Sequence, residues 1–257
     1  MERLRKLIDS PDLVIAPVAL NPLMARMAVE AGFKAVYMSG GSLGWVKCGT
    51  EATITLPEMA EIAMTEAAGF DAIEIEDQLL PRRFHHHVGI EHLVPAEFMV
   101  SKIEEAVAAR RDPNLVIIGR TNALRVTVLD DALRRGEAYK KAGADMIFIH
   151  TRKPEEMRII GERLPAPLMI FAPEDGYGAS PMSPEDLAGL GFRFAASSGS
   201  AFVAMYKAIR QSYECLANGT IDPFLGEGGT VTAMKEARRT AGLDDVLEIE
   251  KRTMGDA

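Results

Sequence analysis

Charged side chains stand at the ends of two apolar runs, where they could bind a small anion and a cation. The run AIEIEDQ carries Glu74, Glu76 and Asp77 near its end, and the run VIIGRTNA contains Arg120. In an extended strand Glu74 and Glu76 share one face and Asp77 points to the other. Carboxylate oxygens are the ligands that magnesium prefers, so Glu76 could hold a divalent cation; an ion pair with a neighbouring arginine is the alternative. The planar guanidinium of Arg120 suits a carboxylate or phosphonate, with an internal ion pair as its alternative.

Two further segments carry groups that could contact a substrate. In VYMSGGS, Ser39, Gly40 and Gly41 offer a hydroxyl and closely spaced backbone N–H groups to an anion, or form a simple turn. The segment PRRFHHHVGIEHLVP follows the Glu76 run and holds four of the five histidines. We interpret it as a gating loop with one histidine near the substrate, rather than as a zinc site. His150 ends another apolar run and is either a site residue or a satisfied core residue.

Short apolar runs alternate with helical patterns, which is typical of βαβ units around a parallel sheet. Gly32, Gly69 and Gly143 each follow a helical pattern and precede an apolar run, which predicts three helix-to-strand joints. The fold class predicted is α/β, a TIM-type (β/α)8 barrel, whose active site lies at the carboxyl ends of the strands. The predicted strands are Leu13–Ala19, Ala35–Met38, Ala72–Glu76, Val116–Arg120, Met146–His150, Leu168–Phe171 and Phe192–Ala196. The predicted helices are Leu23–Ala31, Pro57–Ala68, Ala96–Arg110, Asp130–Ala142, Pro154–Arg163, Pro184–Leu190 and Ala201–Ala217.

The pattern lacks one βα unit, because a closed barrel of this kind has eight strands and the sequence predicts seven. The interval from Met38 to Ala72 contains a long loop and a single helix before the next strand. Residues 1–220 are expected to form the barrel. Residues 221–257 are expected to form a helical extension that packs on a neighbouring subunit.

Composition limits the classes of partner. The 257 residues, 47% of them hydrophobic, suffice for one barrel domain, and a formal charge of −8 argues against a nucleic-acid surface. The sequence contains neither a signal-type segment nor an apolar run of about 18 residues. We therefore expect no membrane segment, and we expect a cytoplasmic location. Cys48 and Cys215 are expected to be free thiols. Neither a phosphate-binding loop of the G-x-x-x-x-G-K-[ST] type nor a G-x-S-x-G nucleophile motif occurs.

Taken in order, SGGS, IEDQLLPRR, VPAEFMVSKIEEAVAARRDPNLVIIGRTNA and GLDDVLEIEKR resemble the isocitrate lyase/phosphoenolpyruvate mutase superfamily over nearly the whole chain. The resemblance implies a magnesium-dependent barrel, with manganese as an alternative ion, and a final helix that swaps between the subunits of a homotetramer. It places Tyr37, Ser39, Gly40 and Gly41 around the substrate's carboxylate, Glu76 in the metal shell and Arg120 on the substrate. A further acidic metal position falls on Glu51, although Thr50 aligns as well.

Two departures from the superfamily pattern affect the expected chemistry. Phe84 stands where the carbon–carbon lyases have a catalytic cysteine, so the proton donor would have to be His85 or His86, and we assign it to His86. The metal motif D-x-D-x-G-Y-G belongs to the strand–helix unit that is absent here. The DGYG string at Asp175–Gly178 follows a late strand and is not assigned to metal binding.

The expected function is a magnesium-dependent carbon–carbon lyase or decarboxylase that acts on a small 2-oxo or 2-hydroxy (di)carboxylate through an enolate. One alternative is a phosphoenolpyruvate or carboxyphosphonoenolpyruvate mutase, or a phosphonopyruvate hydrolase. A second is a non-catalytic, anion-binding barrel that has lost its metal site together with the absent unit.

Overall fold

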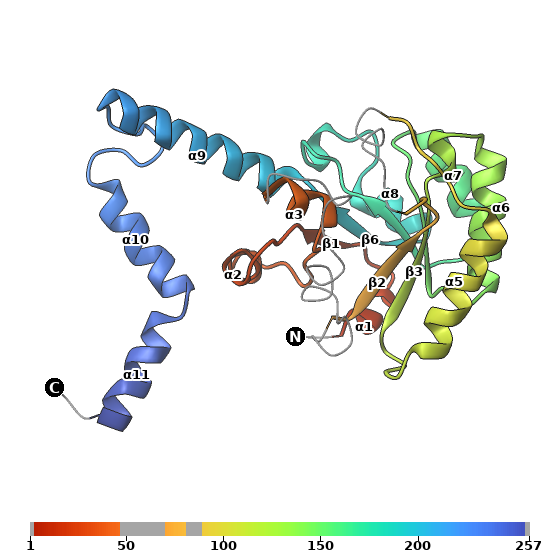
Figure 1. The fold of residues 1–257 in the computed structure, drawn as a ribbon, viewed down its shortest axis with the longest axis horizontal. Coiled ribbons are helices and arrows are strands. Elements are labelled where there is room, and N and C mark those ends of the chain that lie inside the picture. Colours follow the sequence, from red (N-terminus) through yellow and green to blue (C-terminus); the bar gives the residue numbers. More distant parts are fainter. Residues whose placement is uncertain (1–2, 47–69, 81–88, 255–257) are drawn as a thin grey trace.

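The computed structural model describes residues 3–46, 70–80 and 89–254, and its centre is one parallel sheet that curls as part of a barrel (Figure 1). The six strands of the described residues have the order β1-β6-β5-β4-β3-β2. All five pairings are parallel. The strands are β1 Val14–Pro17, β2 Ala72–Glu76, β3 Val116–Thr121, β4 Met146–Ile149, β5 Leu168–Phe171 and β6 Phe192–Ser197.

The predicted strand at Ala35–Met38 is wrong as an extended strand. In this segment a single parallel bridge pairs Tyr37 with Val18, just beyond β1. The N–H of Tyr37 donates to the carbonyl of Pro17, and the N–H of Ala19 donates to the carbonyl of Tyr37. Tyr37 therefore lies beside β1 at one edge of the sheet, although no regular strand forms there.

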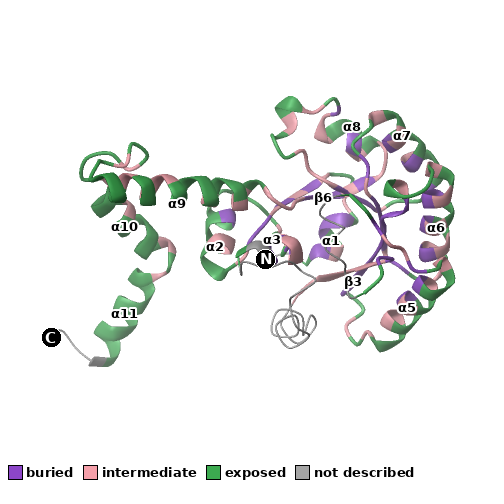
Figure 2. Ribbon diagram, turned by 45° about the horizontal axis from the view of Figure 1, so that its top comes forward, coloured by how far each residue is buried: buried purple, intermediate pink, exposed green. Residues whose placement is uncertain are grey.

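The inner face of the sheet has an apolar floor. Residues two apart along each strand share a face, so Val116 and Ile118 of β3 point inward with Met146 and Phe148 of β4. Helix α1 (Leu4–Ile8) packs its leucine and isoleucine side chains against this inner cluster and lies below the sheet (Figure 2). The floor leaves only the carboxyl ends of the strands for polar inward-facing residues.

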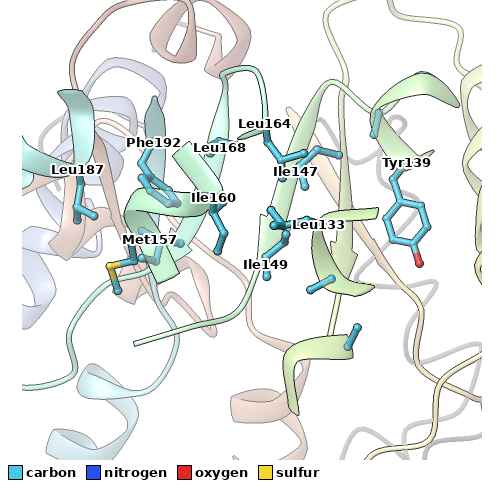
Figure 3. Packing of buried hydrophobic residues seen from close by; sticks show 14 of the residues in the cluster. Leu133, Tyr139, Ile147, Ile149, Met157, Ile160, Leu164, Leu168, Leu187 and Phe192 are labelled. Atoms are coloured by element: carbon cyan, nitrogen blue, oxygen red, sulfur yellow. The ribbon is translucent and has the colours of Figure 1, made fainter. Parts of the chain in front are cut away.

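Four helices cover the outer face of the sheet. Side chains such as Leu133 and Ile160 pack from these helices onto Ile147 and Leu168 of the strands (Figure 3). The helices are α5 Ala96–Ala109, α6 Leu129–Lys141, α7 Pro154–Arg163 and α8 Pro184–Gly189. Each begins and ends within one residue of its predicted range, because their apolar spacing and flanking prolines mark the bounds clearly.

Two helix-to-strand joints follow the glycine pattern expected from the sequence. Gly32 follows α2 (Pro22–Glu30) with a φ of 91°, and Gly143 follows α6 with a φ of 104°. Residues with a β-carbon rarely adopt this left-handed conformation, so glycine ends each helix at little cost. The third predicted joint, at Gly69, lies outside the described residues.

The last three helices form an arm that leaves the sheet (Figure 1). They are α9 Ser200–Asn218, α10 Gly229–Thr240 and α11 Leu243–Met254. Neither α9 nor α10 has a buried residue, and Figure 2 shows most of the arm as exposed. Thr240 at the end of α10 contacts α2, where its carbonyl accepts from Arg26 Nη1 at 3.2 Å and its hydroxyl donates to Glu30 at 3.0 Å. Of the described helices, none is both long and apolar enough to cross a membrane.

Candidate functional site

The carboxyl ends of β2 and β3 bring the predicted charged residues together. Glu76 is the register partner of Arg120, and Glu74 lies two residues earlier on the same inward face. Arg120 Nη1 donates to Glu74 Oε1 at 2.8 Å, and Arg120 Nε lies 3.4 Å from Glu76 Oε2. An ion pair was the alternative to cation binding by Glu76 and to anion binding by Arg120, and the structure contains both ion pairs. They lie at the end of the sheet where the barrel fold places a site.

Arg120 is almost enclosed, with 11% of its side chain exposed. Its guanidinium carbon lies 4.9 Å from the ring centre of Phe148 and 5.3 Å from that of Phe171, so two aromatic faces stabilise the cation. Burial opposes the charge, but Glu74 and other nearby groups outweigh it and raise the pKa of Arg120. The guanidinium stays positively charged inside the site.

Asn122 joins the two charged strand ends. Its side-chain oxygen accepts from Arg120 Nε at 3.1 Å, and its Nδ2 donates to Glu76 Oε2 at 2.7 Å. Asn122 is itself fixed from behind, because its backbone N–H donates to Asp77 at 3.0 Å. Asn122 is not among the site residues predicted from the sequence. Its polar amide directly after an apolar strand is the feature that could have indicated a role in the site.

Asp77 points to the opposite face of β2, as the alternation of the strand predicts. Its fully buried carboxylate accepts from Thr121 Oγ1 at 2.6 Å, Tyr139 Oη at 2.9 Å and Arg135 Nη1 at 3.2 Å. These donors come from β3 and α6, so Asp77 ties the two strand ends to the helix behind them. The carboxylate has a structural position and does not face the barrel interior.

His150 follows β4 and lies beside Arg120. Its ring centre is 5.2 Å from that of Phe171, one of the two rings that the Arg120 guanidinium also contacts. Both imidazole nitrogens are buried, and across the described part of the chain neither has a hydrogen-bond partner. Burial, reinforced by Arg120, lowers the pKa of His150 to about 4, so the imidazole is neutral at pH 7. Within the described residues His150 is not a satisfied core histidine, and it becomes a candidate site residue.

The predicted anion-binding segment lies close to this group. Tyr37 Oη donates to Glu74 Oε2 at 3.2 Å, and the Tyr37 ring meets Phe171 edge-on at 6.2 Å between centroids. Gly40 and Gly41 begin a short helix, α3 (Gly40–Val46), where the sequence predicts an anion-binding segment with a simple turn as the alternative. The hydroxyl of Ser39 accepts from the N–H of Ser42 at 3.3 Å and so caps this helix.

Several predicted residues lie outside the described residues, namely Glu51, Phe84, His85, His86 and His87. The base of the histidine-containing loop is nevertheless defined. The N–H of Leu79 donates to the carbonyl of His92 at 2.7 Å, and the N–H of Val94 donates to that of Asp77 at 2.8 Å. These two bonds hold both ends of the loop at the carboxyl end of β2, which is the end of the sheet where Arg120 lies.

The fit of a magnesium ion depends on the carboxylates of β2. Glu74 and Glu76 both lie within ion-pair distance of the Arg120 guanidinium, so two carboxylates gather at this strand end. Magnesium is commonly bound through one or two carboxylates, with water and substrate oxygens completing the shell. Within residues 3–46, 70–80 and 89–254, no three acidic, histidine or cysteine side chains gather as a metal centre. The residues present fit an ion that Glu76 holds together with substrate oxygens.

A parallel barrel-type sheet with an inward-facing arginine and acidic groups at its carboxyl ends defines an enzyme site for small anions. Comparison with known proteins specifies the class. The chain matches the family model of phosphoenolpyruvate phosphomutase over residues 55–217. It belongs to this family and is an enzyme of the isocitrate lyase/phosphoenolpyruvate mutase superfamily, which also includes 2,3-dimethylmalate lyase.

Three relatives illustrate the similarity. The chain is 30% identical to 2,3-dimethylmalate lyase of Eubacterium barkeri, with 96% of each chain covered. A crystal structure of phosphoenolpyruvate phosphomutase from Streptomyces platensis subsp. rosaceus has a TM-score of 0.84 and 28% identity, with 98% of each chain covered. A phosphonopyruvate hydrolase complex with oxalate and Mg²⁺ has a TM-score of 0.80 and 28% identity, again with 98% of each chain covered.

The alignment with the dimethylmalate lyase also bears on the absent unit. It extends over 285 residues, whereas this chain has 257, so the relative contains residues that have no counterpart here. In the structure, the bridge at Tyr37 and strand β2 form the two edges of the described sheet. The predicted absent strand falls between these two edges in chain order.

Proposed function

We propose that this protein is a magnesium-dependent carbon–carbon lyase or decarboxylase that acts on a small 2-oxo or 2-hydroxy (di)carboxylate through an enolate. The observation that carries the proposal is the buried, charged Arg120 beside a neutral His150 whose ring nitrogens have no hydrogen-bond partner among the described residues, both at the carboxyl ends of the strands. The similarity to 2,3-dimethylmalate lyase supports the same class of substrate.

Arg120 would bind the substrate's carboxylate. Its planar donors match two carboxylate oxygens, and the aromatic surroundings exclude water that would weaken the attraction. Tyr37, Ser39 and the backbone N–H groups of Gly40 and Gly41 would complete the anion site. Fixed donors of this kind stabilise the charge that develops as the neighbouring bond breaks.

His150 would orient the reacting end of the substrate. A neutral imidazole has one N–H donor and one acceptor nitrogen. Neither nitrogen of His150 has a hydrogen-bond partner within the described residues. The donor could hydrogen-bond to the 2-oxo or 2-hydroxy oxygen beside the Arg120-bound carboxylate. We keep His86 as the proposed proton donor.

Glu76, with Glu51 as a second acidic group, would hold the magnesium ion, or manganese in its place. The ion would supply positive charge to the 2-oxo oxygen and so favour the enolate. For Glu76→Gln we expect weaker dependence of turnover on added magnesium. Titration with a chelator measures this dependence, and equal sensitivity of the variant and the parent would remove Glu76 from the assignment.

A phosphorus–carbon reaction is the second candidate, because both the family match and two similar structures belong to proteins of that chemistry. Two assays distinguish the candidates. Pyruvate released from oxaloacetate indicates the decarboxylase, and a change in the phosphorus NMR spectrum of phosphonopyruvate indicates the alternative. A protein that is inactive in both assays and binds no oxalate would contradict both.

We also propose that the arm formed by α9, α10 and α11 packs on a second copy of the chain, within a homotetramer and in the cytoplasm. The arm exposes large apolar side chains, including 80% of Leu216, 77% of Phe224 and 70% of Tyr213. An apolar surface of this extent is rare on a lone chain. A neighbouring subunit would cover it.

A further inference from the structure

We propose that Glu74 is an internal competitor for the substrate's carboxylate and thereby sets the anion affinity of the site. The inference rests on the proposed function, because it concerns the same guanidinium. One carboxylate oxygen of Glu74 accepts from Arg120 Nη1 at 2.8 Å, and the other accepts from Tyr37 Oη at 3.2 Å. Glu74 thus occupies two groups that were assigned to the substrate.

The environment makes this competition strong. The side chains of Arg120 and Glu74 are only 11% and 15% exposed, so their attraction is screened little by water. A substrate anion must draw Arg120 away from Glu74 or share it, while the negative charge of Glu74 repels the anion at close range. Every ligand that uses Arg120 therefore binds more weakly than the guanidinium alone would allow.

Glu76 does not compete in the same way. It lies farther from the guanidinium, with 3.4 Å between Arg120 Nε and its Oε2, and Asn122 Nδ2 donates to that same oxygen at 2.7 Å. Glu74 instead bonds to Nη1, at the end of the guanidinium, and to Tyr37 from across the sheet. The proposal therefore concerns Glu74 and not Glu76.

The test compares oxalate binding by the parent and by Glu74→Gln, measured by isothermal titration calorimetry at fixed magnesium and again without it. The amide keeps the shape and one acceptor but removes the charge, so we expect oxalate to bind about tenfold more tightly. The KM for a turned-over substrate should fall as well. Glu104→Gln, at an exposed position of α5 on the outer face of the sheet, removes one charge and should leave the affinity unchanged.

Glu74→Asp provides a second variant that keeps the charge. Its shorter side chain withdraws the carboxylate from Arg120, and we expect an affinity between those of the parent and Glu74→Gln. Binding in these variants that is equal to or weaker than in the parent would overturn the proposal and make Glu74 a support for Arg120. If the parent turns over its substrate and only this affinity order fails, the proposed function stands; if neither parent nor variants bind oxalate, both fall.

Discussion

Arg120 serves two purposes that compete at the scale of a single residue. In the folded protein it neutralises two partly buried carboxylates, and in the proposed reaction it binds a third carboxylate from the substrate. Truncating one partner of a buried ion pair is costly, because the remaining charge keeps the cost of burial without its counter-charge. Stability and substrate binding therefore depend on the same guanidinium.

Arg120→Ala should lower the free energy of unfolding by about 3 kcal/mol, since Glu74 and Glu76 lose their cation. Chemical denaturation followed by circular dichroism measures this change. Arg163→Ala removes a partner of Glu137 from an exposed pair and should cost less than about 1 kcal/mol. Arg120→Lys keeps the charge and should preserve most of the stability while turnover falls at least about tenfold. Equal stabilities of the two alanine variants would refute this account.

His150 gives the opposite relation between stability and activity. Its two buried nitrogens have no partner in the described chain, and such a group costs about 1–3 kcal/mol. His150→Phe fills the space between Phe148 and Phe171 with an apolar ring, so the variant should be at least as stable as the parent. Its turnover should fall by about a hundredfold, in the range of lost general acid–base or orienting groups. A clearly destabilised variant would indicate that His150 has a structural partner.

His150 also predicts a pH dependence of stability. The folded protein keeps the imidazole neutral down to about pH 4, whereas the unfolded chain takes up the proton near pH 6.5. Between these values the unfolded state binds more protons, so the contribution is complete above pH 6.5 and is lost as the pH falls towards 4. The difference between parent and His150→Phe should change by about 2–3 kcal/mol across this window. Parallel pH profiles would contradict the lowered pKa.

The sequence predicted much of the site at this scale. Alternation along β2 correctly placed Glu74 and Glu76 on one face and Asp77 on the other. Alternation along the strand could not predict that Arg120 would donate to Glu74, which lies 46 residues earlier in the chain. The lack of a hydrogen-bond partner for the His150 nitrogens among the described residues was also unpredictable, because it depends on packing from several elements.

At the scale of elements, the carboxyl ends of β2 and β3 are fixed by hydrogen bonds from helix α6. Tyr139 and Arg135 of α6 both reach Asp77, and Asp77 in turn holds Asn122. The buried strands and amphipathic outer helices were predicted well, since their period and flanking residues agree. The segment Ala35–Met38 was mispredicted because its apolar composition resembles a strand, while only Tyr37 forms a β-bridge.

Two helical glycines test how closely α7 and α8 pack. A β-carbon at Gly161 of α7 would lie 2.5 Å from the carbonyl oxygen of Leu190, whereas one at Gly189 of α8 would meet no atom within 4 Å. Gly161→Ala should therefore destabilise the protein by about 2 kcal/mol despite the better helix propensity of alanine. Gly189→Ala should stabilise it by about 0.5 kcal/mol. Thermal unfolding of both variants measures the contrast, and equal shifts would show that the helices can move apart.

At the scale of the whole molecule, the sheet with its covering helices and the arm differ in burial. The sheet has apolar clusters on both faces, while large apolar side chains are exposed along α9, α10 and α11. Figure 2 shows most of the arm as exposed. The sequence predicted an appended helical extension after residue 220, and that boundary stays a prediction. Burial between subunits cannot be derived from one chain, because exposed apolar residues have no partner within it.

Leu216→Glu should reduce the assembly to smaller species, because the charge falls on the most exposed large apolar residue of α9. Light scattering coupled to size-exclusion chromatography measures the mass. Ala208→Glu adds the same charge at another exposed position of α9 and should leave the assembly intact. A parent protein that is monomeric at micromolar concentration would contradict the proposed arrangement.

The hydrogen bond from Tyr37 to Glu74 joins the two edges of the described sheet at the position of the predicted absent strand. A ligand that displaces Glu74 from Arg120 and Tyr37 would break this hydrogen bond as it binds. Ligand binding would then change the distance between the two edges. Substrate binding would thus alter the width of the curled sheet. A sheet closed by a continuous ladder of paired strands resists such a change.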